Sequence, residues 1–437
     1  MSSAAPAASR LAIRGDLLDF SADPGFAPPH EATGVRLRSN HWLLVDAGRI
    51  VAVQADAPDP SFTRHVHAGA LILPGFIDTH VHSPQLEVVA SHGADLLKWL
   101  SSYTFPAELR HADPAFAAAS AAAFCDSLLA HGTTAACVFP TVHKTSADAL
   151  FAAAFERGMR VIAGKCLMDR NAPAGLTDTV ASAERDSLDL IARWHGRGRL
   201  AYAHTVRFAP TSTPAQLALA GALLAAHPGT YMQTHVAENR DELRWVAELF
   251  PESRSYLGVY DAHRLLGPRS VLAHGIWLDA EDHVRLSASG AQIAHCPSSN
   301  LFLGSGLMDW QALHHAGVPV SLGSDVGGGT SLSMQRTLAD AYRVAALRGV
   351  KLSAWTLLHA ATRGAAQSLQ LGGEIGSFEP GTLADIAVWQ WAATPVAKQR
   401  DAVSRDLHDR VFAWMMLSDE RNLVATYVAG ERVMKGV

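Results

Sequence analysis

The chain has 437 residues, more than one domain usually holds, so a large domain with a smaller one is the simplest expectation. Charged residues make up only 18%, as in a globular protein, and no apolar run approaches the roughly 18–20 residues of a membrane helix. With a net charge of −5, the chain lacks the excess of basic residues that binding to nucleic acid requires. Scattered cysteines and the absence of a secretory apolar region favour a cytoplasmic protein.

Both ends of the chain carry short β-type runs separated by turn residues. In LLVDAGRIVAV, Asp46 to Gly48 supply the turn between two apolar alternations. Similar runs, ADIAVWQ and LVATYVAGERVM, return after about residue 374. We therefore expect residues 1–72 and 375–437 to pair into one small β-sandwich domain.

Residues 73–374 alternate short apolar runs with Ala- and Leu-rich stretches, which is typical of βα units around a parallel sheet. The candidate strands are LILPGFIDTH, GTTAACVFP, RVIAGKCLMD, RLAYAHTVRF, GTYMQTHVAE, SVLAHGIW, AQIAHCP and VPVSLGSD. Eight strands predict an α/β fold, a closed (β/α)₈ TIM barrel. The helix after the fourth strand has readable ends: Thr213 as N-cap, Pro214 at the first position, and Pro228-Gly229 as the stop.

A pair of histidines ends the first of these strands. His80 and His82 lie two residues apart, so on a strand both side chains face the same way and can bind one metal ion. The spacing alone is weak support, because His65 and His67 repeat it in the β-type region, where we expect a structural role. Position distinguishes the pairs, since barrel enzymes build their sites at the C-terminal ends of strands.

Three more metal-binding side chains stand at strand ends. His235 ends the fifth strand in QTHVAEN, His274 the sixth in LAHGIW, and Asp325 the eighth in LGSDVGGG. Imidazoles and a carboxylate at four strand ends predict a site in which a divalent ion lowers the pKa of bound water to about 7. These residue types do not distinguish zinc from iron.

Longer motifs follow one another in order along the chain: PGFIDTHVHSPQ, WLSSYTFPAE, VRF, QTHVAEN, LAHGIWL, AHCPSSNLFLGSG, GSDVGGGTS and IGSFEPGTLADIAVW. Through them the chain resembles the amidohydrolase superfamily and, within it, the guanine deaminase family, over nearly its whole length. The resemblance implies a homodimer that hydrolyses a small-molecule purine, converting guanine to xanthine and ammonia.

The resemblance also implies roles for the residues at the strand ends. One Zn²⁺ per subunit, with Fe²⁺ as the alternative, would be bound by His80, His82, His235 and Asp325. His274 would contact the activated water. A second metal is not expected, because Lys165 lies on the third strand and not on the fourth, where binuclear relatives carry a bridging lysine.

Glu238 stands three residues after His235, at the barrel mouth, where a charged side chain has few structural reasons to be. Deamination moves protons from water to a ring nitrogen and to the leaving amine, so two carboxylates near the metal are useful. We expect Glu238 to carry the first proton, to N3, and Asp325 the second, with the reverse assignment left open.

Substrate recognition is predicted from Arg207, Phe208 and Gln85. If C2 of guanine faces the metal, O6 and N7 point away from it, and an arginine such as Arg207 matches that pair. Phe208 would cover the base, and Gln85 would offer an amide to the N1, N3 or amino edge. The predicted substrate-binding set also contains His235, Glu238 and Trp99.

Trp99 and Tyr103 form an aromatic helical face that fits a lid over the mouth and core packing equally well. Base deaminases with H-x-E and P-C-x-x-C motifs are excluded, because the chain has no C-x-x-C. Two alternatives stay open. One is a superfamily deaminase of 8-oxoguanine, an adenosine-like compound or a triazine, and the other is a non-catalytic scaffold.

Overall fold

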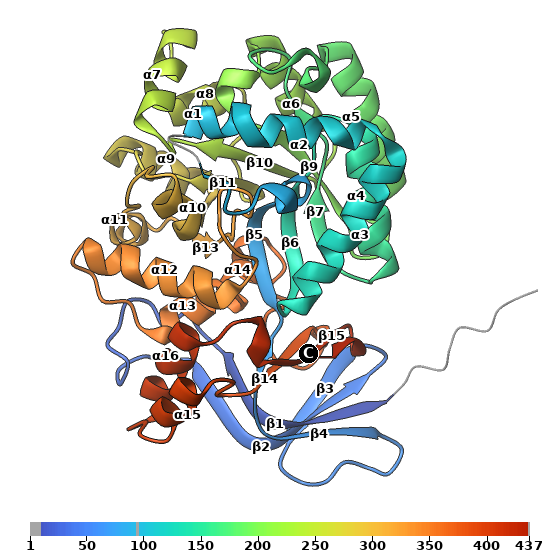
Figure 1. Ribbon diagram of the computed structural model, residues 1–437, viewed down its shortest axis with the longest axis vertical. Helices are drawn as coiled ribbons and strands as arrows, with labels where there is room; N and C mark the ends of the chain where they lie inside the picture. Colours follow the sequence, from blue (N-terminus) through green and yellow to red (C-terminus); the bar gives the residue numbers. More distant parts are fainter. Residues whose placement is uncertain (1–9, 93–95, 436–437) are drawn as a thin grey trace, which may run out of the picture. The chain divides into compact units, whose positions relative to one another are not determined.

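The computed structural model describes residues 10–92 and 96–435 (Figure 1). The chain divides into two compact units. The first contains the residues up to Ile77, Leu128–Thr134 and the segment from Leu352, and the second contains Asp78–Ser127 and Ala135–Lys351. The domain boundaries expected after residues 72 and 374 stay a prediction.

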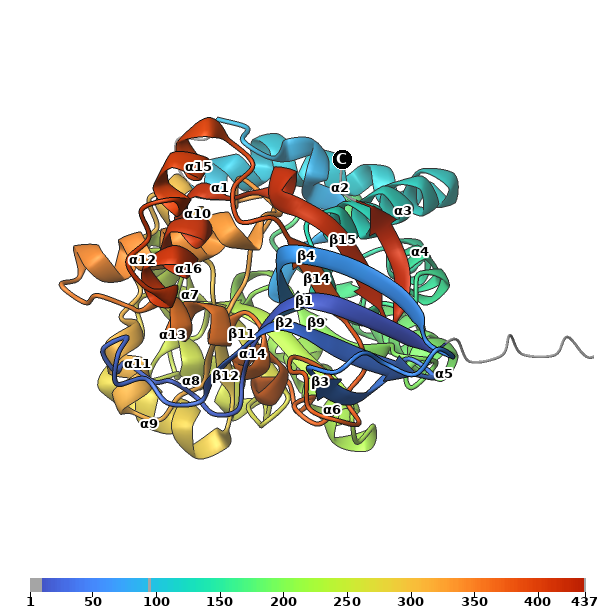
Figure 2. The same ribbon diagram turned by 90° about the horizontal axis from the view of Figure 1, so that it is seen from below.

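The first unit is built on a seven-stranded sheet to which both ends of the chain contribute (Figure 2). Its strands, in the order in which they pair, are β16 (Glu431–Lys435), β15 (Leu423–Val428), β14 (Ile386–Trp389), β4 (Thr63–Pro74), β1 (Leu11–Phe20), β2 (Val35–Asp46) and β3 (Arg49–Gln54). β4 pairs in parallel with β1 and antiparallel with β14, so the N-terminal and C-terminal strands share one sheet, as expected. Leu17, Val45, Ile72, Val388 and Tyr427 are among the residues of its buried core.

The turn expected at Asp46 to Gly48 is confirmed. Asp46 ends β2 and pairs with Arg49, the first residue of β3. The φ angles of Ala47 (49°) and Gly48 (77°) are both positive, as required by the two-residue turn that matches the twist of the strands. The helices of this unit are α13 (Ala354–Ala360), α14 (Arg363–Ser368), α15 (Pro395–Asp401) and α16 (Leu407–Leu417).

A nearly closed parallel barrel forms the second sheet, which confirms the expected fold class. Its strands are β5 (Phe76–His82), β6 (Thr133–Phe139), β7 (Arg160–Ala163), β8 (Cys166–Leu167), β9 (Ala201–Val206), β10 (Tyr231–Val236), β11 (Ser270–His274), β12 (Gln292–His295) and β13 (Val320–Leu322). Side-chain and backbone bonds bring its two ends together: Thr79 Oγ1 donates to Leu322 O at 3.0 Å, and Asp325 N donates to His80 O at 2.8 Å.

Two of the expected barrel strands differ from the prediction. The run LILPGFIDTH is split at Gly75, because Leu71 to Pro74 belong to β4 of the first sheet and the barrel strand begins at Phe76. The run RVIAGKCLMD is interrupted after Ala163, and β8 then pairs with β9. Gly164 lies so close to β9 that a Cβ there would be 1.9 Å from Ala203 O.

Helices follow the barrel strands in the chain: α3 (Pro114–Ala130), α4 (Lys144–Glu156), α5 (Val180–Trp194), α6 (Pro214–Ala226), α7 (Arg240–Leu249), α8 (Tyr256–Ala262), α9 (Ala280–Ser289), α10 (Pro297–Phe302), α11 (Trp310–His315) and α12 (Met334–Leu347). The predicted ends of α6 are confirmed: the Thr213 side chain accepts from Gln216 N, Pro214 is the first residue, and the helix ends at Ala226. None of the described helices is long and apolar enough to cross a bilayer.

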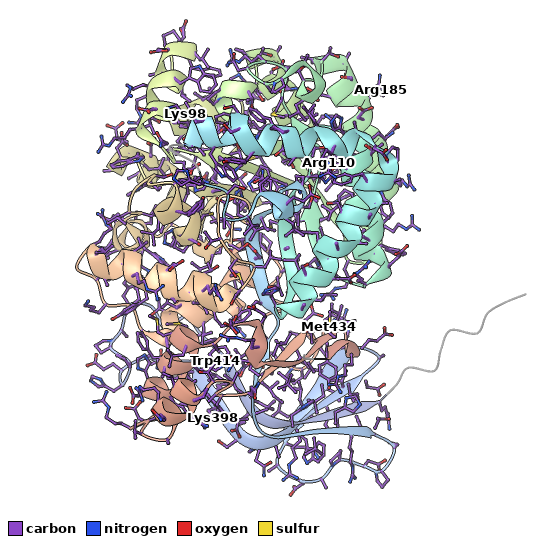
Figure 3. All side chains as sticks on the ribbon, in the orientation of Figure 1. Lys98, Arg110, Arg185, Lys398, Trp414 and Met434 are labelled. Carbon is purple, nitrogen blue, oxygen red and sulfur yellow. The ribbon has the colours of Figure 1, made fainter. Side chains whose placement is uncertain are left out.

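An irregular helical segment follows β5. It contains the 3₁₀ turn Ser83–Val88, α1 (Leu96–Trp99), the π turn Leu100–Thr104, α2 (Phe105–Leu109) and the 3₁₀ turn Arg110–Ala112. Leu96, Trp99 and Ala107 pack in a cluster with Val88 and Leu303. Lys98 and Arg110, labelled in Figure 3, are exposed. The segment therefore buries an apolar cluster and exposes charged side chains.

We predict that Thr213→Ala lowers the free energy of unfolding by about 1 kcal/mol or more, because it removes the hydroxyl that caps α6 and also donates to Asp169 Oδ2. Urea-induced unfolding measures the change, and Thr213→Ser, which keeps the capping oxygen, serves as the control. Equal losses in the two variants would contradict the assignment of the hydroxyl as the cap.

Candidate active site

His80 and His82 point to the same face at the C-terminal end of β5, and Asp325 meets them from the loop that follows β13. The Nε2 atoms of both histidines lie 3.2 Å from Asp325 Oδ1, and all three side chains are almost fully buried. Burial lowers the pKa of His80 to about 4, so its imidazole is neutral. Burial raises the pKa of Asp325, but His80 and His82 hold it well below the usual range, so the carboxylate is charged.

His235 completes this group from the end of β10. Its Nδ1 lies 2.6 Å from Arg207 O, and because a carbonyl only accepts, Nδ1 carries the hydrogen and Nε2 presents a lone pair. That Nε2 lies 3.2 Å from His82 Nε2. Phe139, the last residue of β6, packs against the rings of His80, His82 and His235.

These four residues fit a divalent cation. Their ligand atoms all lie within 4.8 Å of one another. A spacing of 3.2 Å between His82 Nε2 and His235 Nε2 suits two nitrogens that share a cation at about 2.1 Å each. Imidazole nitrogens and a carboxylate oxygen are donors that zinc and iron accept.

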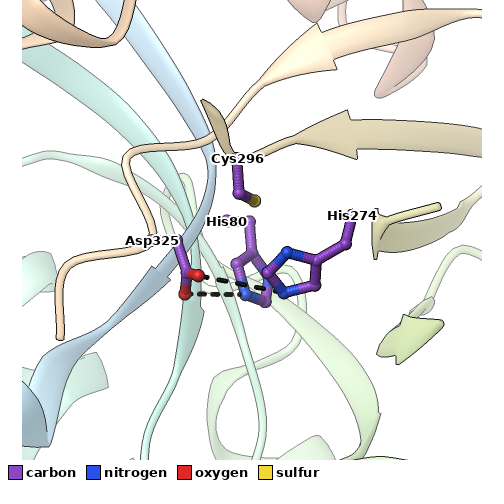
Figure 4. A group of neighbouring side chains, drawn as sticks. All are labelled: His80, His274, Cys296 and Asp325. Atoms are coloured by element: carbon purple, nitrogen blue, oxygen red, sulfur yellow. Dashed lines mark ion pairs between the residues drawn. The ribbon is translucent and has the colours of Figure 1, made fainter. Parts of the chain in front are cut away.

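A second group of potential ligands shares His80 and Asp325 with the first and adds His274 and Cys296 (Figure 4). Burial raises the pKa of the Cys296 thiol well above its usual range, which keeps the sulfur protonated. Its Sγ donates to Ala294 O at 3.4 Å. The group that contains His82 and His235 offers three imidazoles and one carboxylate with converging ligand atoms, so it is the better candidate cation site.

His274, at the end of β11, is oriented toward the carboxylates. Its Nδ1 donates to Asn300 Oδ1 at 2.8 Å, and its Nε2 lies 3.4 Å from Glu238 Oε2 and 3.8 Å from Asp325 Oδ2. Burial lowers the pKa of His274, but the nearby carboxylates of Glu238 and Asp325 together raise it by more. The net shift of the pKa is therefore upward. His274 (φ 72°) and Asp325 (φ 49°) both adopt the left-handed backbone region, a strain that is common at functional sites.

Glu238 lies in the loop after β10 and is 4% exposed. Burial raises the pKa of its carboxyl to about 7. Ser305 Oγ donates to Glu238 Oε1 at 3.0 Å. The loop is held from behind by Glu242, whose Oε2 accepts from Glu238 N at 3.0 Å and whose Oε1 accepts from Tyr256 OH at 2.7 Å.

A pocket with about 440 Å³ of empty space opens beside these groups. Its lining includes all the predicted substrate-binding residues, namely Gln85, Trp99, Arg207, Phe208, His235 and Glu238. Leu96, Leu100 and Leu303 add apolar wall, which suits the faces of a flat ring. Tyr103 is 36% exposed and does not line the pocket, so only Trp99 of the aromatic pair reaches it.

Glu108, on α2, was missed by the sequence reasoning. Its carboxylate is fully buried and accepts from Arg207 Nη1 at 2.6 and 2.8 Å and from Gln85 Nε2 at 3.0 Å. The sequence offered one indication of its role, because Glu108 is the one charged residue of the segment WLSSYTFPAE. Asn300, which orients His274, was missed as well.

The second histidine pair and Lys165, for which no metal-binding role is expected, lie outside the candidate cation site. His65 Nδ1 and His67 Nε2 lie 2.9 and 3.1 Å from Tyr427 OH, as befits a structural role. Lys165 is buried and paired with Asp178, and its Nζ donates to Cys166 O at 3.2 Å. Neither group is among the potential metal sites of the described residues.

We predict that His82→Ala abolishes stoichiometric binding of a divalent cation, because it removes one of four converging ligands. Elemental analysis of the purified protein measures the metal content. His67→Ala is the matched control, since it removes a histidine of the same spacing outside the site and should retain the metal. Retention of full metal content by His82→Ala would contradict the ligand assignment.

The chain is similar to known proteins over nearly its whole length. The amidohydrolase family model matches residues 71–433. Guanine deaminase of Escherichia coli (strain K12) is 43% identical over 428 residues, 97% of each chain. A solved structure of E. coli guanine deaminase covers 97% of this chain and 99% of its own, with a TM-score of 0.94.

Two further structures of guanine deaminases are similar. The one from Bradyrhizobium japonicum is 34% identical, with a TM-score of 0.94 and coverage of 98% of this chain and 99% of that chain. The one from C. acetobutylicum, with guanine bound in its active site, is 26% identical, with a TM-score of 0.87 and coverage of 98% and 100%. The chain therefore belongs to the amidohydrolase family and, within it, to the guanine deaminases.

Proposed function

We propose that this protein hydrolyses guanine to xanthine and ammonia, with a divalent cation held by His80, His82, His235 and Asp325. The observation that carries the proposal is the convergence of these ligands beside a pocket that contains Arg207 and Gln85. A cation bound by nitrogen and oxygen ligands with one open position supplies a water of lowered pKa, about 7. The guanine deaminases that the chain resembles support the choice of substrate.

Glu238 is the proposed first proton carrier. Hydrolysis adds water at C2 and releases the amine as ammonia, so protons must move from the water to ring N3 and to the departing nitrogen. A buried carboxyl whose pKa is raised to about 7 both accepts and donates a proton near neutral pH. Ser305 and His274 hold one oxygen each of Glu238.

Asp325 is the proposed second proton carrier. Its Oδ1 faces His80 and His82, and its Oδ2 is turned toward His274. This division gives one oxygen to the cation site and leaves the other for proton transfer to the leaving amine. His274 acts between the two carboxylates, where its Nε2 is placed to contact the attacking water.

Substrate binding uses other residues of the pocket lining. Arg207 donates to O6 and N7 of guanine, Gln85 meets the N1 edge, and Phe208 and Trp99 cover the base. We further infer one Zn²⁺ per subunit, with Fe²⁺ as the alternative that elemental analysis distinguishes. We also infer that the protein is cytoplasmic and that it forms a homodimer. Analytical sedimentation tests the dimer.

We predict that the purified protein converts guanine to xanthine and ammonia, and that a chelator removes the activity, which added Zn²⁺ restores. The release of ammonia from guanine, 8-oxoguanine, adenine and ammeline is measured to identify the substrate. Activity on another heterocycle with none on guanine would overturn the proposal in favour of another superfamily deaminase, and no bound metal would favour the scaffold alternative.

We predict that Glu238→Gln keeps the metal and lowers kcat by about 10²- to 10⁴-fold, because the amide cannot carry the proton. Steady-state kinetics and elemental analysis measure the two effects separately. Glu248→Gln, an exposed neighbour on α7, is the control and should leave both unchanged. Loss of the metal in Glu238→Gln would refute its role as a proton carrier that does not coordinate.

A further inference from the structure

Glu108 is a buried charge behind the two residues that face the purine edge. Gln85, Glu108 and Arg207 are each 3% exposed or less. Arg207 Nη1 donates to both carboxylate oxygens, and Gln85 Nε2 donates to one of them. Arg207 and Gln85 line the pocket, so both substrate-facing side chains are fixed by one carboxylate.

The chemistry of Glu108 determines how these side chains can be oriented. A carboxylate only accepts hydrogen bonds, so the amide of Gln85 must turn its NH₂ group toward Glu108 and cannot exchange it with Oε1. Gly327 leaves room for this orientation, since a Cβ there would lie 1.8 Å from Gln85 Oε1. Gln85 and Arg207 together form what we call the polar wall of the pocket. This wall therefore has a fixed arrangement of donors and acceptors.

The same carboxylate neutralises Arg207. It uses only Nη1 of the guanidinium, which leaves Nε and Nη2 as donors that this carboxylate does not take up. A buried guanidinium without a counter-charge would attract anions and would be free to adopt other positions. With Glu108 in place, the wall combines zero net charge with donors at a fixed position, which suits a neutral base.

We propose that Glu108 is a positioning residue that fixes the hydrogen-bond polarity of this wall and thereby selects 6-oxopurines over 6-aminopurines. The inference rests on the proposed deamination of guanine. A 6-oxopurine presents O6 and N7 as acceptors to Arg207 and N1–H as a donor to Gln85. A 6-aminopurine presents a donor at position 6 and an acceptor at N1, so both contacts would set like groups against each other.

Hypoxanthine and adenine test the proposal, because both lack the 2-amino leaving group and they differ in the groups at position 6 and N1. Each is measured as a competitive inhibitor of guanine turnover by the metal-loaded protein. In the wild type, hypoxanthine should bind more tightly than adenine. In Glu108→Gln, whose amide both donates and accepts, the ratio of the two inhibition constants should fall by about 10-fold or more.

Arg207→Met tests whether Glu108 acts through Arg207. If it does, Glu108→Gln combined with Arg207→Met should lose less selectivity than the product of the two single losses. Asp178→Asn is the matched control, because it breaks another buried pair, with Lys165, outside the pocket lining. That control should lower thermal stability and leave the ratio of inhibition constants unchanged.

An unchanged ratio in Glu108→Gln, or equal weakening of both inhibitors, would overturn the proposal and leave Glu108 a purely structural role. If Glu108→Gln does not fold, Glu108→Asp, which withdraws the carboxylate by one methylene, carries the same test with a ratio lowered by about threefold. A wild-type protein that does not turn over guanine would instead refute the proposed function. The two failures are therefore distinguishable.

Discussion

The contact between the first and last barrel strands is the constraint on which the site depends. β13 has only three residues, so side-chain bonds supplement its backbone pairing. Asp78 accepts from Ser324 N at 3.0 Å and also from the Ser324 hydroxyl, and Asp325 N donates to His80 O. These bonds fix the end of β13 beside β5, and the carboxylate of Asp325 consequently meets the two histidines at ligand distance.

Besides Glu242, which holds the loop of Glu238, three buried carboxylates lie in or beside the pocket wall, and the protein gives each of them a different environment. Asp325 is kept charged by the neighbouring histidines. Glu238 has few compensating partners, so burial raises its pKa to about 7. Glu108 is paired with Arg207 and Gln85. Proposed metal binding, proton transfer and substrate orientation thus fall to three separate carboxylates, because each function requires a different balance between burial and charge.

The strand ends could be predicted from the sequence because each is a short apolar run followed by a polar side chain, as at His235 and Asp325. The break after Ala163 could not, since it depends on how closely Gly164 approaches β9. The partner of Arg207 was also out of reach, because Glu108 lies 99 residues away on an irregular helical segment. Local patterns identify strands and candidate ligands, whereas pairings between distant elements arise only from the folded barrel.

The contact between β5 and the end of the barrel also joins parts of the chain that are far apart in the sequence. Asp78 and Ser324 are separated by 246 residues, so Ser324 is synthesised much later. Until β13 is in place, β12 would expose an unpaired edge, which is a hazard for aggregation. The proposed cation has its carboxylate ligand only after that last strand has docked. A cation that binds only the barrel with β13 docked stabilises it by mass action, so metal supply during folding would favour the state in which β12 is paired.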